Sequence, residues 1–163
     1  MSVAINGSGT ITGLTATGIS AQPVFAGNVL QVVSATYATT VTSTSSSYSD
    51  TGLTASITPT SSSSKILVLI NQAGCGKLAG DGGLSLKLVR GTTDVGVFSI
   101  GSGYDGDTGY NYIGSCSASF LDLPSSASSV AYKTQIARSF GSGSAVVQAD
   151  SATSTLILME IAG

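Results

Sequence analysis

The chain has 163 residues, a formal net charge of −2 and only 9% charged residues, and it contains no histidine and no tryptophan. Histidine performs most acid–base chemistry near neutral pH and is the commonest transition-metal ligand, so we expect a non-enzymatic protein without metal or other cofactor. The six Lys and Arg residues are scattered singly along the chain, which argues against nucleic-acid binding. No apolar stretch approaches the ~18–20 residues of a membrane span, so no membrane partner is expected.

The first 25 residues form a segment of their own. Glycines separate single apolar residues here, so the segment cannot bury a core by itself. We expect residues 1–25 to be an extended attachment arm that becomes ordered against a partner, with an unstructured tail as the alternative. The segment lacks the regions of a secretory signal, which favours synthesis and retention in a cytoplasm. The apolar residues that would anchor the arm are Val3, Ile5, Ile11, Leu14 and Ile19.

Residues 26–163 are expected to form one head domain. Short apolar stretches alternate with clusters of Gly, Ser, Thr, Asp or Pro, and no window shows helical periodicity. This pattern predicts an all-β protein, a jelly-roll-like antiparallel β-sandwich of about eight to ten strands. The predicted strands cover residues 29–37, 38–44, 48–58, 66–72, 84–89, 95–100, 117–123, 130–139, 145–148 and 155–161.

Two of these strands, at 66–70 and 156–161, are apolar at nearly every position. A strand with one face in water would carry polar residues at alternate positions, so both faces of these strands should be buried. We expect another subunit to cover the outer face, with a covering loop as the alternative. Glu160 would then need a Lys or Arg partner or a place at an edge. The predicted interface residues are Ile66, Val68, Ile70, Leu156, Leu158 and Ile161.

The segment 101–112 is predicted to be an exposed loop that contains three tyrosines, Tyr104, Tyr110 and Tyr112. Tyrosines among small polar residues make adaptable binding surfaces, so we expect this loop to face a ligand; packing of the rings on the core edge is the alternative. Asp105 and Asp107 have the spacing of the start of a calcium loop, but the closing bidentate acid is missing, so an ordinary exposed loop is favoured.

Cys75 and Cys116 are the two cysteines of the chain. In a reducing cytoplasm we expect two small buried thiols, with a disulfide between neighbouring strands as the alternative.

Three stretches of the sequence resemble virion surface proteins of tailed bacteriophages: INGSGTITGLTATGI, VLQVVSATYATTVTSTSSSYSDTGLTASITPTSSSSKILVLI and STLILMEIAG. The resemblance covers most of the chain outside 101–115 and 124–150. It implies a homotrimer on the exterior of the phage particle, in which a thin N-terminal segment attaches to capsid or tail proteins and a jelly-roll-like head projects outward.

Two roles within that family remain open. The short chain has no shaft or coiled coil, which favours a capsid decoration or cement protein. The alternative is a tail fibre that recognises a host surface glycan or protein through Tyr104–Tyr112, and a third reading is a carbohydrate-binding β-sandwich.

Overall fold

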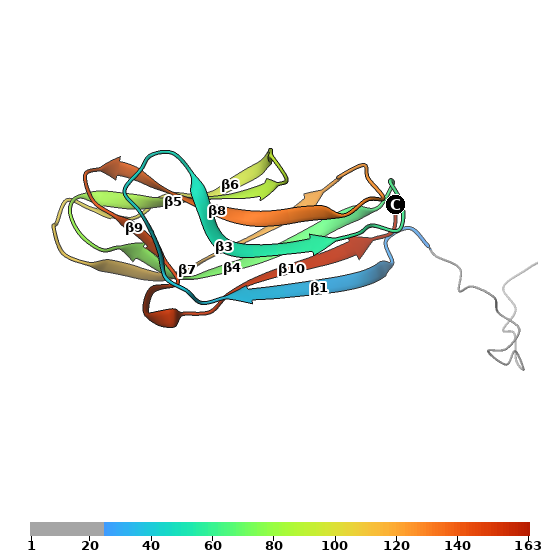
Figure 1. Cartoon of the computed structure of the whole chain (residues 1–163), viewed down its shortest axis with the longest axis horizontal. Coiled ribbons are helices and arrows are strands. Elements are labelled where there is room, and N and C mark those ends of the chain that lie inside the picture. The colour runs from blue at the N-terminus through green and yellow to red at the C-terminus, as the bar shows by residue number, and fades with distance from the viewer. Residues whose placement is uncertain (1–24) are drawn as a thin grey trace, which may run out of the picture.

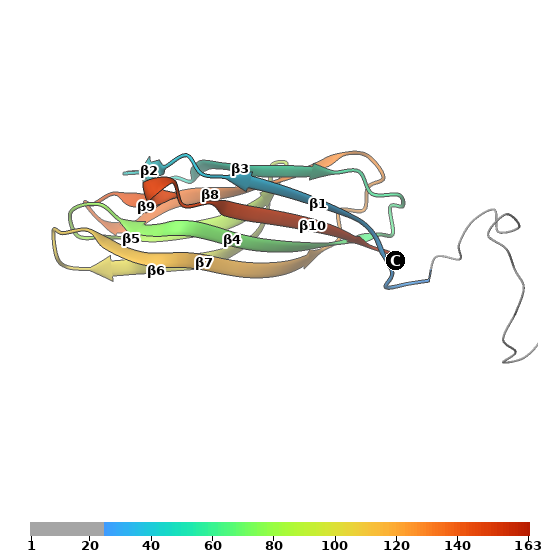
Figure 2. The same cartoon turned by 90° about the horizontal axis from the view of Figure 1, so that it is seen from below.

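The computed structural model describes residues 25–163, which fold into two antiparallel β-sheets packed face to face (Figures 1 and 2). The predicted all-β sandwich is therefore confirmed, whereas the predicted arm residues lie outside the described part of the chain. No helix within residues 25–163 is long and apolar enough to cross a membrane. The first sheet holds β1 (Val29–Tyr37), β2 (Val41–Ser43), β4 (Lys65–Lys77), β7 (Asn111–Asp122), β9 (Ala145–Val147) and β10 (Ser154–Ile161); the second holds β3 (Ser49–Ile57), β5 (Gly82–Arg90), β6 (Thr93–Asp105) and β8 (Val130–Gly141).

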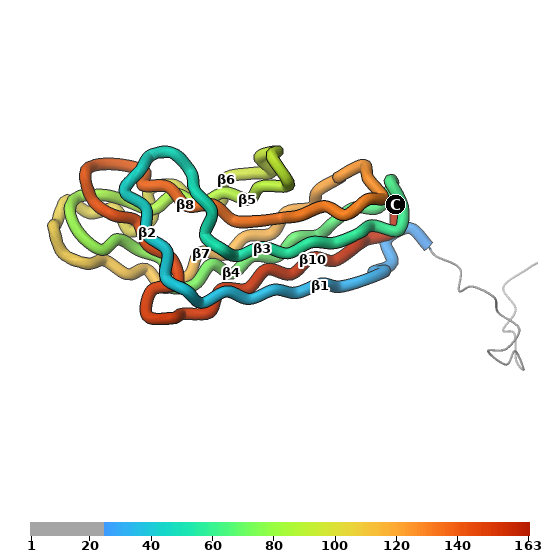
Figure 3. The backbone as a smooth tube through the Cα atoms, in the orientation of Figure 1, coloured from blue at the N-terminus to red at the C-terminus, as the bar shows by residue number. Residues whose placement is uncertain are grey.

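The eight long strands alternate between the two sheets. In the first sheet, β1, β10, β4 and β7 are neighbours in that order, and the second sheet has the order β3-β8-β5-β6. Among these strands only the β5–β6 hairpin joins neighbours in one sheet, and the other connections cross from one sheet to the other, as the chain path in Figure 3 shows. The order of neighbours therefore comes from long-range pairing rather than from consecutive hairpins.

Strand boundaries agree with the prediction at most positions, but three strands are longer than predicted. β4 continues to Lys77 instead of ending at residue 72, and β7 begins at Asn111 instead of residue 117, so Tyr112 lies in a strand and not in the predicted loop. Residues 101–105 were expected in a loop, but β6 continues through them to Asp105. Gly101 and Gly103 have φ of 70° and 71°, a region open to glycine, and the β5–β6 register shifts nearby. These glycines thus create bulges within a strand.

The space between the sheets holds two apolar clusters separated by a polar layer. One cluster is built around Val68, Leu158 and Tyr132, and the other around Leu86 and Ile136. Between them, the Thr134 hydroxyl donates to Gln72 Oε1 at 2.8 Å, and Gln72 Nε2 donates to Ser154 Oγ at 3.0 Å. Because these side chains are fully buried, each hydrogen bond satisfies a group that water cannot reach.

Glu160 lies on the inward face of β10, and its environment corrects the sequence expectation. The strand is flanked by β1 and β4, so it is not at an edge, and no Lys or Arg pairs with the carboxylate among residues 25–163. Instead, Gln31 Nε2 donates to Oε2 at 2.6 Å, while the backbone N–H and hydroxyl of Thr60 each donate to Oε1 at 2.7 Å. Desolvation by burial raises the pKa of this carboxyl, but the hydrogen bonds outweigh it and lower the pKa to about 2.

Candidate functional surfaces at the two ends of the sandwich

The sandwich is elongated, and its two ends differ. At one end, called proximal here, the described chain begins and also terminates (Figures 1 and 2). There the N–H of Gly27 donates to the carbonyl of Ala162 at 2.8 Å, and the N–H of Ala162 donates to the carbonyl of Asn28 at 2.8 Å. The loops that follow β4, β6 and β8 lie together at the opposite, distal end (Figure 1).

Apart from Val97 on β6, the large exposed apolar side chains form two groups of different chemistry. The distal group combines aromatic and Ile residues with Gly, Ser and Asp, whereas the proximal group is mainly aliphatic. The distal group is Ile100, Tyr104, Tyr110, Tyr112, Ile113 and Phe140, and the proximal group is Phe25, Val29, Val32, Leu121 and Leu123.

The three tyrosines predicted to face a ligand are exposed at the distal end, with 53%, 73% and 49% of Tyr104, Tyr110 and Tyr112 accessible. Tyr110 and Tyr112 lie parallel, with ring centroids 6.3 Å apart. Tyr104 meets the ring of Phe140 edge to face at 5.6 Å. Their exposure argues against the alternative of packing on the core edge. Sequence reasoning missed Phe140, although its place at a strand end before Gly141 was a usable signal.

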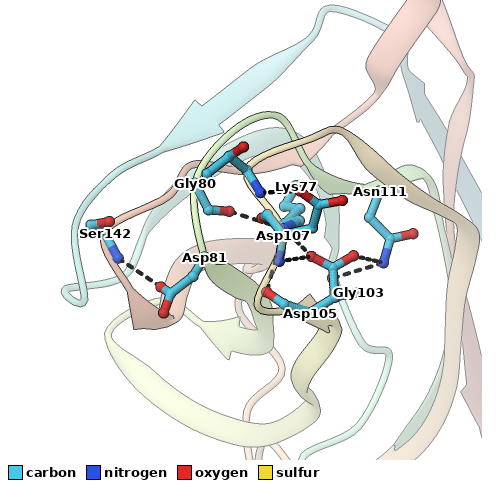
Figure 4. A network of polar contacts seen from close by, with 9 residues as sticks. Lys77, Gly80, Asp81, Gly103, Asp105, Asp107, Asn111 and Ser142 are labelled. Carbon is cyan, nitrogen blue, oxygen red and sulfur yellow. Dashed lines mark hydrogen bonds and ion pairs between the residues drawn. The ribbon is translucent and has the colours of Figure 1, made fainter.

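A buried lysine holds the distal loops together (Figure 4). The Lys77 ammonium is closed off from solvent, donates to the carbonyl oxygens of Gly80 at 2.9 Å and of Asp107, and forms an ion pair with the Asp105 carboxylate. Asn111 Nδ2 donates to the other oxygen of that carboxylate at 2.9 Å. The hydrogen bond from Lys77 is the main cause that lowers the pKa of Asp105. The loop therefore has an internal cation.

This arrangement argues against the alternative that residues 105–111 bind calcium. The loop oxygens that a cation would use already face the Lys77 ammonium. Within residues 25–163, no cluster of three or more acidic, Cys or His side chains has the arrangement of a metal site. The contacts of Lys77 instead hold the loop in place, and the loop in turn positions the neighbouring tyrosines.

A shallow depression of about 230 Å³ adjoins the distal aromatic residues. Its floor contains the small side chains Ser85, Ala137 and Ser139, and Tyr48, Ile100 and Phe140 also line it. The Ser85 and Ser139 hydroxyls lie 2.8 Å apart and hydrogen bond to each other. The depression is smaller than the ~300–1,000 Å³ typical of small-molecule pockets.

The outer face of the first sheet is apolar toward the proximal end. Cross-strand pairing places Val32, Met159, Leu67 and Leu121 in one row across β1, β10, β4 and β7. The next row holds Ile157 and Leu69 between Ser34 and Ser119. We call this surface the proximal apolar face; its apolar members are Val29, Val32, Leu67, Leu69, Leu121, Leu123, Ile157, Met159 and Ile161.

The predicted interface residues require a correction at this point. Ile66, Val68, Ile70, Leu156 and Leu158 are 0–3% exposed and pack in the core between the sheets of their own chain. They cannot meet another subunit. The outward face of these strands belongs to the alternate residues, which are half-buried in the single chain. Of the six predicted side chains, Ile161 alone lies on that face.

The outer face of the second sheet carries charged side chains that pair across its strands. Lys133 Nζ pairs with Asp50 Oδ2 at 2.8 Å, and Lys87 Nζ pairs with Asp94 Oδ1 at 2.7 Å. Gln135 Nε2 also donates to Asp50, and these hydrogen bonds lower the pKa of the Asp50 carboxyl. Ion pairs across strands are usual on a sheet face that meets water.

The two cysteines are free thiols near one another in the second apolar cluster. Cys75 Sγ donates to the carbonyl of Gln72 at 3.0 Å. The neighbouring Cys116 thiol, together with burial, raises the pKa of Cys75. Both cysteines are free thiols, as expected, but only Cys75 is buried and Cys116 is half-buried.

The similarity of this chain to known proteins is distant. No protein-family model matches the chain, and no curated protein does. Among solved structures, the structure of infectious bursal disease virus Gx strain matches with a TM-score of 0.42 and 12% sequence identity, over 83% of this chain and 33% of that chain. The chain thus spans about a third of that viral chain, and a likeness this distant supports no functional conclusion.

Proposed function

We propose that this chain is a non-enzymatic structural protein of a bacteriophage virion, a trimeric decoration protein on the particle exterior that attaches through residues 1–25. The proposal rests on the difference between the two ends of the molecule. The described chain begins at the proximal end, beside the C-terminus, and the loop between β6 and β7 lies at the distal end (Figure 1). Tyr110 lies in this loop, and Tyr104 and Tyr112 lie in the strand ends that flank it. Attachment through the N-terminal segment would therefore direct the tyrosines away from the particle.

The strand order supports the same proposal. Each sheet contains four long strands, and among these eight strands all but one connection cross between the sheets. This is the arrangement of a jelly roll, a fold used by viral capsid and lectin domains. Because one fold serves many functions, the order alone does not choose between those classes. The sequence resemblance to phage surface proteins favours the virion.

A tail-fibre or other receptor-binding role is the second candidate, and the exposed distal aromatic residues favour it. Rings that are 49–73% exposed suit stacking against a sugar or contact with a host protein. In that role the proximal end would still carry the attachment, so the two candidates differ in location and copy number rather than in orientation.

Copy number per particle separates the two candidates. Quantitative mass spectrometry of purified particles should give hundreds of copies for a decoration protein, whereas about a dozen copies would indicate a fibre. Loss of glycan-array binding after replacement of Tyr104, Tyr110 and Tyr112 by Ala would also favour the receptor-binding role.

The attachment arm is tested with two variants of the full chain. One lacks residues 1–22, and the other keeps the full length but carries Ser in place of Val3, Ile5, Ile11, Leu14 and Ile19. We expect both variants to lose binding to particles that lack the native protein. If the first still binds, the arm is not the attachment; if only the second binds, the backbone and not the apolar residues makes the contact.

A further inference from the structure

We infer that the proximal apolar face is the surface through which copies of this chain associate with one another. The inference rests on the proposed homotrimer and identifies the face that would form it. The first ground is the difference between the two outer faces. The second sheet carries ion pairs across its strands. On the proximal apolar face, the outward positions paired across β1, β10, β4 and β7 hold a single charged side chain, Lys65, which lies opposite Ile161 at one end of the face.

The composition of the face is that of an interface with an apolar centre. The row Val32–Met159–Leu67–Leu121 is aliphatic throughout, and the row formed by Thr36, Thr155, Asn71 and Ser117 borders it with uncharged polar groups. An apolar centre depleted of charge inside a polar rim is the usual anatomy of a protein–protein contact. A nucleic acid, a charged glycan or an acidic peptide would need charged partners, and the face offers almost none.

The size of the face also suits a protein partner. Four strands about 4.8 Å apart, over about six residues of strand length, cover about 400 Å² in projection. A standard interface takes about 800 Å² from each partner, so the apolar face would supply the centre and its hydroxyl-rich border the remainder.

The distribution of exposure favours further copies of this chain. Among the members that lie in strands, the most exposed are on the lateral strands, Val32 on β1 and Leu121 on β7, each 56% exposed, and Leu123 directly after β7 is 59% exposed. The central Leu67 and Met159 are half-buried. In a ring of identical subunits, the β1 side of one face meets the β7 side of the next. The net charge of −2 per chain gives little repulsion between copies.

The test compares Val32→Asp with Val97→Asp in the full chain by sedimentation velocity. Val97 is the matched control because it is also an exposed valine on an edge strand, 48% accessible, but on the second sheet. We expect the wild type and Val97→Asp to sediment near 48 kDa, three times the 16.1 kDa chain. Val32→Asp should sediment as a single chain, with association weakened at least about 100-fold because an unpaired carboxylate would be buried. Leu121→Asp should behave likewise.

Each outcome has a distinct meaning. If Val32→Asp and Leu121→Asp remain oligomeric with native circular dichroism, the inferred face is wrong although the homotrimer stands. If Val32→Asp unfolds, the sedimentation of Leu121→Asp decides whether the inferred face is right. A wild-type chain that sediments as one compact subunit at tens of micromolar overturns the inference. If self-association requires Val32 and yet the protein is not found on particles, the inference stands and the proposed function fails.

Discussion

Replacing Glu160 with Gln should destabilise the protein near neutral pH far more than a loss of one surface charge would. The wild-type carboxylate accepts three hydrogen bonds, one from Gln31 and two from Thr60, and has no solvent exposure. The amide of Glu160→Gln can offer one accepting oxygen. Its NH₂ group must then face either the Gln31 amide nitrogen or the Thr60 donors, so at least one buried donor loses its acceptor.

The magnitude follows from the displacement of the carboxyl pKa. A value of about 2 in the folded protein, against an ordinary value of 4.5, corresponds to at most about 3 kcal/mol of folding free energy. Because the folded-state pKa is depressed, this contribution is fully present above pH 4.5 and is lost as the pH falls through about 2.

Urea unfolding at fixed protein concentration, followed by circular dichroism from pH 7 to pH 2, measures the effect. Glu160→Gln should lose about 2–3 kcal/mol at pH 7, and the difference from the wild type should shrink steadily below pH 4.5. Asp94→Asn, at an exposed ion pair, is the matched control and should change stability by less than about 1 kcal/mol. A difference between the wild type and Glu160→Gln that stays constant across this pH range would refute the reasoning.

Three further changes test other parts of the structure. Thr134→Val removes the donor to Gln72 Oε1 and should cost about 1–3 kcal/mol in urea unfolding, and an unchanged midpoint would mean that the polar layer contributes nothing. Lys77→Met removes the internal cation, so amide hydrogen exchange over residues 105–111 should accelerate while exchange in β8 is retained; equal exchange in both proteins would contradict the role of Lys77. Iodoacetamide should label Cys116 before Cys75, because burial and the adjacent thiol raise the pKa of Cys75, and mass spectrometry that finds equal rates would disprove this order.

Fold class and most strand positions could be predicted from the sequence, because alternating apolar residues and turn residues report local geometry directly. Which residues of the two apolar strands face inward could not be predicted. When both faces of a strand are apolar, the pattern no longer says which face is inward. Glu160 adds to the error, since a carboxylate usually marks an outward face, and here it points inward with Leu156 and Leu158. Only the donors supplied by Gln31 and Thr60, distant in sequence, make that orientation possible.

The distal end shows a second limit of sequence reasoning. The tyrosines of 104–112 could be predicted to be exposed because of their Gly- and Asp-rich surroundings. Nothing local indicated that Lys77, about 30 residues upstream, would lie buried among the oxygens of that loop. Similarly, Phe140 joins Tyr104 only because β8 and β6 both flank β5 in the second sheet. Contacts of this kind follow from the strand order.

Imaging of intact particles tests the proposed function most directly. Cryo-electron microscopy of virions, with an antibody fragment directed at the Tyr104–Tyr112 segment as a marker, should show groups of three heads on the capsid. The marker should lie at the end of each head farthest from the particle surface. Single isolated heads, a marker located against the capsid, or the absence of the protein from the virion would each contradict the proposal.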